Sequence, residues 1–333
     1  MTAIIVIENT NLDDEVVVSS KAGGIGGSRL GLKKGDKITV KNLLYGLMLC
    51  SGNDAAVALA EKVGGSVKEF ANKMNEKAKE LKLKNTHFVT PHGLDDPEHY
   101  TTAYELAVLT NYAMSNETFA KIVGTKNYTV LINGYSKDIK NTNELLGYLD
   151  GVKGVKTGFT NNAGRCLVTC VKRGDFEIIT IVLGADTKKI RTEDSIKLIE
   201  YTYKNYKQVN IATIIEEKFS EWKNININRI LINKKSNNSK LDLNIENLQQ
   251  EIIPLKASQI DNIDIEVYCL FALEAPVLKG ETIGTVKISI HGDVIATVNI
   301  KTMEQIERKT KKEYFLEFLK VMSWLLQIIL LSL

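Results

Sequence analysis

The first part of the chain spaces its apolar side chains as helices do. Apolar residues recur every three or four positions over 41–49, 55–63 and 67–81, which predicts three helices. Thr102 and Glu105 have the Thr-x-x-Glu spacing of a capping box, which predicts another helix that continues through Tyr112. Residues 1–9 are mostly apolar and are typical of the middle of a buried helix. This part of the chain is therefore expected to be mainly helical.

After Asn127 the apolar period changes from that of a helix to that of a strand. Runs rich in Val, Ile and Thr predict three strands over 151–160, 165–172 and 177–183. The turn Arg173-Gly174-Asp175 joins the last two strands, which favours an antiparallel pair. A helix over 192–206 closes the unit. Helices and an antiparallel sheet in one unit predict an α+β domain over residues 1–207.

The pattern changes again after residue 207. Short β-prone runs lie at 229–233, 263–270, 285–290 and 294–300. His291-Gly292-Asp293 has the composition of a hairpin turn between the last two runs. We expect a small, separate all-β domain over 208–302. It contains no glycine-rich nucleotide loop or aromatic cluster, so its expected role is structural support or spacing.

The last region, 303–333, differs in kind from the rest of the chain. Four basic residues, Arg308, Lys309, Lys311 and Lys312, lead into an apolar stretch over 314–333 with five polar interruptions. A buried helix would keep one polar face, whereas basic residues beside an apolar helix suit lipid headgroups. We therefore predict a membrane-anchoring helix, and the sequence leaves open whether it spans the bilayer or lies in its plane.

Composition and charge exclude several classes of function. The 333 residues are 44% hydrophobic and 25% charged, which is ordinary for a globular protein. A net charge of +3 is too balanced to indicate a nucleic-acid partner. The four histidines form no metal-binding spacing, and the four cysteines form no CxxC pair. We expect no metal and no cofactor, and we interpret the cysteines as small buried apolar residues.

Two short segments carry candidate chemistry. Ser51-Gly52-Asn53 lies between two predicted helices, where it is either a helix cap or part of a catalytic site. Lys156-Thr157-Gly158 lies on a predicted strand, where it offers an ammonium and a hydroxyl group to a carboxylate. A glycine within a strand often marks the close approach of a ligand. Neither triplet is specific alone.

In this order, the two triplets resemble two of the three sequence elements of penicillin-binding proteins and serine β-lactamases. Longer segments over 26–61, 86–107 and 150–168 are similar to blocks of the low-molecular-mass penicillin-binding proteins, the D-alanyl-D-alanine carboxypeptidases of peptidase family S11. The resemblance implies the α+β penicillin-binding-protein and serine β-lactamase-like transpeptidase fold. It also implies a C-terminal stalk and anchor.

The resemblance implies a serine-type reaction in peptidoglycan maturation. A serine attacks the carbonyl between the two terminal D-alanines of a stem peptide, forms an acyl-enzyme and is freed by water. Ser51 would pass a proton to the leaving nitrogen, and Asn53 would hold the amide side of the substrate. β-Lactam antibiotics would bind as mimics of this substrate.

The resemblance also assigns roles along the strand. Lys156 and Thr157 would bind the terminal carboxylate of the peptide or of penicillin. Gly158 would let the substrate pair with the strand edge, and the backbone N–H of Phe159 would supply half of the oxyanion hole.

One family element is missing from the sequence. The Ser-x-x-Lys element with the nucleophile would lie just ahead of Met1, and no other Ser-x-x-Lys lies in a family context. We therefore expect the chain as given to be N-terminally truncated, to lack a signal peptide and to be inactive alone. The full-length protein would act at the extracytoplasmic face of the bacterial cell membrane.

Two other functions stay open. A non-catalytic relative would use Lys156 and Thr157 to hold peptidoglycan without cleaving it. A serine β-lactamase relative is a weaker alternative, because the helix with Glu105 and Asn111 lacks the Glu-x-x-Leu-Asn spacing of the class A deacylating group.

Overall fold

The computed structural model describes residues 1–236, 239–248 and 251–331, with only the backbone of Leu330 and Leu331. By its contacts the chain divides into two compact units, Met1–Lys204 and Asn205–Leu333, and each is described here by itself. The division falls three residues before the predicted boundary at 207.

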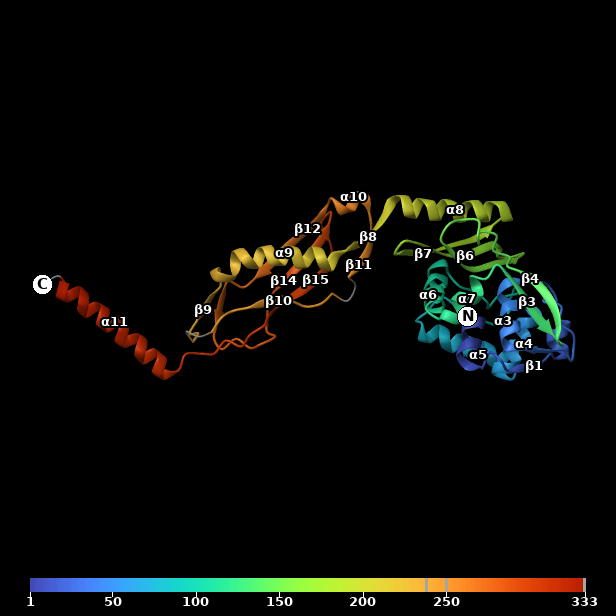
Figure 1. Cartoon of the computed structure of the whole chain (residues 1–333), viewed down its shortest axis with the longest axis horizontal. Helices are drawn as coiled ribbons and strands as arrows, with labels where there is room; N and C mark the ends of the chain where they lie inside the picture. Colours follow the sequence, from blue (N-terminus) through green and yellow to red (C-terminus); the bar gives the residue numbers. More distant parts are fainter. Residues whose placement is uncertain (237–238, 249–250, 332–333) are drawn as a thin grey trace. The chain divides into compact units, whose positions relative to one another are not determined.

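The predicted helices of the first unit are present (Figure 1). They are α1 (Thr2–Asn9), α3 (Val40–Leu49), α4 (Asn53–Gly64), α5 (Val67–Glu80) and α6 (Ala103–Met114), with α7 (Glu117–Val123) following. Side chains such as Ile4, Leu44, Leu59 and Phe70 are fully buried in one core. The helices that apolar periodicity predicted therefore pack together around one core.

The capping box at α6 is only half formed. The Thr102 hydroxyl accepts a hydrogen bond from the backbone N–H of Glu105, as predicted. The Glu105 carboxylate does not return to the cap. It accepts hydrogen bonds from the backbone N–H of Asn85 and the hydroxyl of Thr86, which tie the preceding loop to the helix.

Several short elements surround the helices. They are β1 (Glu15–Val17), α2 (Ser20–Gly24), β2 (Lys37–Thr39), β3 (Asn127–Ile132) and β4 (Tyr135–Lys140). The β3–β4 hairpin turns at Asn133 and Gly134, both with positive φ, which suits the twist of a two-residue hairpin.

The main sheet of the first unit has the order β5-β6-β7, all antiparallel. The strands are β5 (Val152–Thr160), β6 (Gly164–Arg173) and β7 (Phe176–Ala185). One face packs on the helical core through Val155 and Cys170. The other packs on α8 (Lys188–Asn205) through Leu167 and Ile199, so the sheet lies between α8 and the other helices (Figure 1).

This arrangement confirms the predicted α+β fold. It leaves β5 as an edge strand within the described residues, with its free edge beside the helices. α8 begins four residues before the predicted start at Thr192. Its first turn holds Lys188 and Lys189, and such polar residues give no apolar period to detect.

The second unit contains the predicted strands. Its four-stranded sheet has the order β10-β15-β14-β12, from β10 (Leu243–Ile245), β12 (Ile263–Cys269), β14 (Thr282–Ile290) and β15 (Asp293–Thr302). His291 and Gly292, both with positive φ, form the predicted turn between β14 and β15. Shorter pairs join β8 (Tyr206–Asn210) to β11 (Ile252–Lys256) and β9 (Leu231–Asn233) to β13 (Ala272–Glu274).

The second unit also contains helices that the sequence analysis did not predict. The longest is α9 (Ile211–Asn226), and η1 (Ile227–Arg229) and α10 (Ala257–Ile260) are short. Ile211, Ile215 and Phe219 are buried at a spacing of four, so one helical face covers the sheet. The Asn210 side chain caps α9 by accepting from the N–H of Thr213.

The chain ends in α11 (Lys311–Leu331), and residues 332 and 333 of the predicted helix lie outside the described residues. Its large apolar side chains, including Phe315, Phe318, Trp324 and Ile329, are exposed. Across the described part of the chain, no helix is both long enough and apolar enough to cross a membrane.

Candidate active site

The Ser51-Gly52-Asn53 turn is shaped by its backbone and not by a side-chain cap. Ser51 has a φ of 58°, in the left-handed region, and Gly52 is the N-cap of α4 with no side-chain cap bond. A Cβ on Gly52 would lie 2.9 Å from Asp54 Oδ1 and 3.0 Å from the backbone nitrogen of Leu30. Capping by a side chain therefore does not explain this turn, and glycine is required where two segments meet.

Asn53 is fixed by the loop over residues 25–32. Its side chain is 6% exposed, and Nδ2 donates to the carbonyl of Gly26 at 2.8 Å. Its backbone N–H donates to the carbonyl of Ser28, also at 2.8 Å. A Cβ on Gly27 would approach Asn53 Nδ2 to 2.6 Å, so this glycine lets the loop lie against the amide. The amide is thus held in one orientation.

Asp54 anchors the same loop, and the sequence analysis did not select it. Its carboxylate is fully buried and accepts the backbone N–H groups of Leu30, Gly31 and Leu32 at 2.8, 2.8 and 2.9 Å. A buried carboxylate needs such donors to offset its lost hydration. No sequence signal distinguishes it from an acidic residue in an exposed first turn of a helix.

Lys156 and Thr157 lie on β5, as predicted. The Lys156 ammonium donates to the carbonyl of Thr157 at 2.9 Å, and burial lowers the pKa of Lys156 to about 8. The Thr157 hydroxyl lies 2.7 Å from the hydroxyl of Thr142, a residue in the loop after β4 that the sequence analysis did not select. Because the Lys156 ammonium has lost part of its hydration, it would interact strongly with an anion that enters the groove.

Gly158 and Phe159 continue the strand beyond the lysine. Gly158 pairs in register with Cys166, and a Cβ at Gly158 would make only an ordinary 3.5 Å contact with it. The Phe159 side chain is 51% exposed. The guanidinium carbon of Arg165, its register partner on β6, lies 3.6 Å from the centre of the Phe159 ring.

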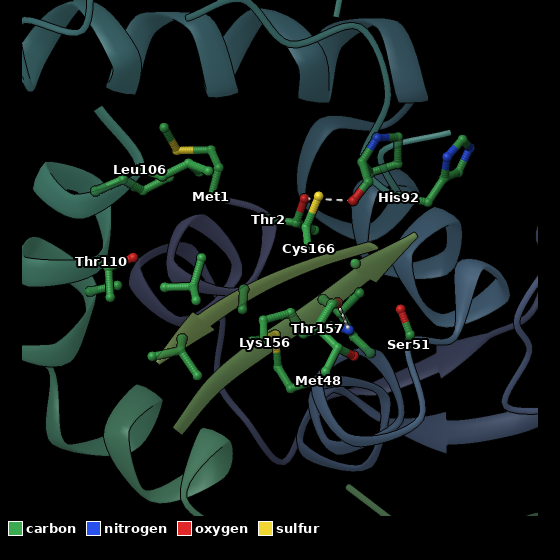
Figure 2. A pocket seen from close by; sticks show the side chains of 18 of the residues that line it. Met1, Thr2, Met48, Ser51, His92, Leu106, Thr110, Lys156, Thr157 and Cys166 are labelled. Carbon is green, nitrogen blue, oxygen red and sulfur yellow. Dashed lines mark hydrogen bonds between the residues drawn. The ribbon is translucent and has the colours of Figure 1, made fainter. Parts of the chain in front are cut away.

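A groove brings the candidate residues together. Its volume is about 690 Å³, and its lining includes all six predicted site residues: Ser51, Asn53, Lys156, Thr157, Gly158 and Phe159. A more apolar cavity of about 310 Å³ shares Ser51, Asn53 and Lys156 with it and continues past Met1, Leu106 and Phe119. Figure 2 shows Ser51, Lys156 and Thr157 near one end of this cavity and Met1, Leu106 and Thr110 near the other.

Two further residues line both spaces. His92 accepts a hydrogen bond from the N–H of Leu94 through Nδ1, and burial lowers its pKa to about 4, so the ring is neutral at physiological pH. Cys166 is half-buried and lines both spaces, and Figure 2 shows it in the more apolar cavity. Of the four cysteines, only Cys170 is fully buried, so the prediction of four buried cysteines was wrong for the other three.

A buried arginine completes the groove wall. The Arg191 side chain on α8 is 4% exposed and pairs with Glu144 at 2.9 Å, while its Nε has no hydrogen-bond partner among the described residues. The Nε–H group is itself buried, so it is an unsatisfied donor inside the groove wall. The sequence analysis did not select Arg191, because the residue lies just before the predicted start of this helix.

The described residues contain no cluster of three or more His, Cys, Asp or Glu side chains that could hold a metal ion. A Ser-x-x-Lys spacing does occur at Ser220 and Lys223, on α9 of the second unit. There Lys223 is paired with Asp242 at 2.6 Å. That lysine is committed to a structural ion pair.

Two family models match the chain. The model described as D-alanyl-D-alanine carboxypeptidase, peptidase S11, matches residues 1–187, and that of the penicillin-binding protein 5 C-terminal domain matches residues 232–308.

Similar proteins agree with these matches. D-alanyl-D-alanine carboxypeptidase DacF of Bacillus subtilis is 32% identical over 337 residues, which cover 96% of this chain and 80% of the relative. DacD of Escherichia coli is 40% identical over 189 residues, 56% of this chain and 48% of that relative. The crystal structure of DacD from Francisella tularensis superposes with a TM-score of 0.72 at 25% identity, over 92% of this chain and 86% of the other.

Proposed function

The chain belongs to the peptidase S11 family of D-alanyl-D-alanine carboxypeptidases, and we propose that its groove binds stem peptides of peptidoglycan by their D-Ala-D-Ala end. In this family reaction a serine-type enzyme removes the terminal D-alanine through an acyl-enzyme. The observation that carries the proposal is the meeting of Lys156 and Thr157 with Ser51 and Asn53 in one groove along the free edge of β5.

Each predicted residue has a geometry that suits its role. The half-buried Lys156 ammonium and the Thr157 hydroxyl would bind the terminal carboxylate, since charge-assisted hydrogen bonds are strong where water is scarce. The free edge of β5 at Gly158 would pair with an extended peptide, and the N–H of Phe159 would face the carbonyl oxygen. The fixed Asn53 amide would accept or donate to the backbone of the peptide.

Ser51 is suited to proton transfer and not to nucleophilic attack. Its hydroxyl makes no hydrogen bond to a base among the described residues, although it lines both spaces. Resemblance places the nucleophile just ahead of Met1, and Met1 lines the same cavity. We therefore expect Ser51 not to form an acyl-enzyme with the peptide.

Binding can be measured by calorimetry with an acetylated peptide that ends in D-Ala-D-Ala and with its C-terminal amide. The free acid should bind, and the amide should bind about tenfold or more weakly because it lacks the charge that Lys156 meets. Lys156→Met should remove this preference. Lys153→Met, which changes an exposed lysine on the same strand, is the matched control.

Equal affinity for the acid and the amide would overturn the proposal. Mass spectrometry of residues 1–333 after incubation with penicillin tests whether Ser51 is acylated, and we expect no covalent adduct. An adduct on Ser51 would show that this serine is itself the nucleophile.

Membrane attachment is a separate part of the proposal. Peptidoglycan lies outside the cytoplasmic membrane, and α11 exposes apolar side chains beside Lys309, Lys311 and Lys312. We propose that α11 lies in the plane of an anionic lipid surface. Sedimentation with vesicles should remove the full chain from solution but not a variant that ends at residue 308; retention of both in solution would exclude this attachment.

A further inference from the structure

The groove carries more positive than negative side chains beyond the residues that meet the terminal carboxylate. Arg165, Lys188 and Arg191 line it in addition to Lys156, whereas Asp95 is the single acidic side chain among the described lining residues. Arg191 is paired with Glu144. Arg165 and Lys188 form no ion pair with any residue that the structure describes.

Arg165 is held in place without being neutralised. It lies directly across from Phe159 in the β5–β6 register, and its guanidinium stacks on the Phe159 ring at 3.6 Å. Cation–π stacking fixes the plane of the guanidinium but leaves its N–H donors free. Such an arginine is pre-organised to receive a carboxylate, which can accept two of those donors at once.

The position of Arg165 along the strand defines which part of a peptide it meets. Phe159 follows Thr157 by two residues, so their Cα atoms are separated by about 7 Å along an extended strand. A peptide that pairs with the β5 edge has the same rise per residue. If its last residue lies at Thr157, the residue two positions earlier lies beside Phe159 and Arg165.

We propose that Arg165, positioned by Phe159, is a specificity-determining residue for stem peptides that carry a free side-chain carboxylate two residues before the C-terminus. The substrate class is therefore a peptide whose residue at that position has an acidic side chain. A peptide with a basic side chain there, or with the side-chain carboxyl amidated, binds less well. This inference rests on the proposed function, because Thr157 must hold the peptide end.

The test uses two peptides of the form acetyl-X-D-Ala-D-Ala, where X is diaminopimelic acid with its side-chain carboxyl either free or amidated. Calorimetry with residues 1–333 should give about fivefold tighter binding for the free carboxylate, the range expected for a half-exposed charge pair. Arg165→Gln should remove this difference and leave binding of the amidated peptide unchanged. Lys172→Gln, at an exposed lysine of the same strand, should preserve the difference.

A second variant tests the role of the ring. Phe159→Leu removes the stacking surface, so the preference for the free carboxylate should decrease even though Arg165 remains. Binding of the amidated peptide reports on folding, because a misfolded variant would no longer bind either peptide. If Arg165→Gln misfolds, Arg165→Lys replaces it. The lysine keeps the charge but not the planar guanidinium, so the preference for the free carboxylate should decrease.

Equal binding of the two peptides to the unmodified chain would overturn the proposal, as would a preference that survives Arg165→Gln. Failure of the underlying function looks different. In that case a peptide with an amidated C-terminus would bind as well as the free acid, whatever the side chain of X.

Discussion

Two charged groups near the groove, Asp54 and Lys156, are satisfied to very different degrees. Asp54, beneath the loop 25–32, accepts three backbone N–H groups within 2.9 Å. Lys156, on β5, donates one hydrogen bond to a carbonyl, and its pKa is lowered to about 8. Asp54 thus has its partners within the fold, whereas Lys156 has an ammonium that the fold alone does not compensate.

The difference teaches how to distinguish a structural charge from a binding charge. A carboxylate with a full set of donors stabilises the folded state, and removing it leaves those donors unpaired. An ammonium with an incomplete set destabilises the folded state slightly and gains its missing partner from a ligand.

The largest effect should come from Asp54→Ala. The buried N–H groups of Leu30 and Leu32 and the partly buried N–H of Gly31 would lose their acceptor, which should lower the free energy of unfolding by about 3–5 kcal/mol. Urea denaturation followed by circular dichroism measures this change. Asp14→Ala, which breaks an exposed ion pair with Lys62, should cost under about 1 kcal/mol. If both variants lose the same small amount, Asp54 is not the anchor of the loop.

A smaller and pH-dependent effect is expected for Lys156. Affinity for a peptide with a free C-terminus should fall as the pH rises above about 8, because the neutral amine no longer attracts a carboxylate. The unfolded chain keeps the ordinary lysine pKa of 10.5 and so binds more protons than the folded chain between pH 8 and 10.5. This group should therefore make the free protein more stable as pH rises through that window.

The two trends run in opposite directions, which makes them a sharp test. Calorimetry gives the affinity and thermal unfolding gives the stability, each compared with Lys156→Met, in which both contributions should be absent. Affinity that stays constant from pH 7 to 9.5 would mean that Lys156 does not contact the carboxylate.

The smallest effect should come from Thr142→Val. This change removes the hydroxyl partner of Thr157 and should weaken peptide binding about three- to fivefold, the usual worth of one neutral hydrogen bond. Unfolding should change little, since Thr157 stays on its strand. Thr129→Val, which removes a hydroxyl contact with Asp138 on the exposed hairpin, is the control and should leave binding unaltered.

Much of the fold could be predicted from the sequence. Apolar periodicity located the helices and the β5–β7 strands because each element buries one face or one side. It missed α9, whose isoleucines have high strand propensity although Ile215 and Phe219 keep helical spacing. Packing against the sheet of the second unit stabilises the helical conformation of that segment.

The site was predictable only in part. The triplets at 51–53 and 156–158 are continuous in sequence, so a motif can identify them. Thr142, Asp54 and Arg191 act through partners that lie 15 to 47 positions away, and no local pattern reports such a partner. Their roles depend on the tertiary structure, which brings these partners together.

The hydrogen bonds to Asp54 should slow the opening of the loop over residues 25–32. A loop without regular secondary structure ordinarily exchanges its amide hydrogens quickly. The amides of Leu30, Gly31 and Leu32 are instead bonded to a carboxylate at the buried start of α4, between residues 22 to 24 positions apart in the chain. Their exchange with deuterium should be as slow as that of the central helices, so the loop that carries Gly27 and Ser28 into the groove lining opens only when the whole unit unfolds.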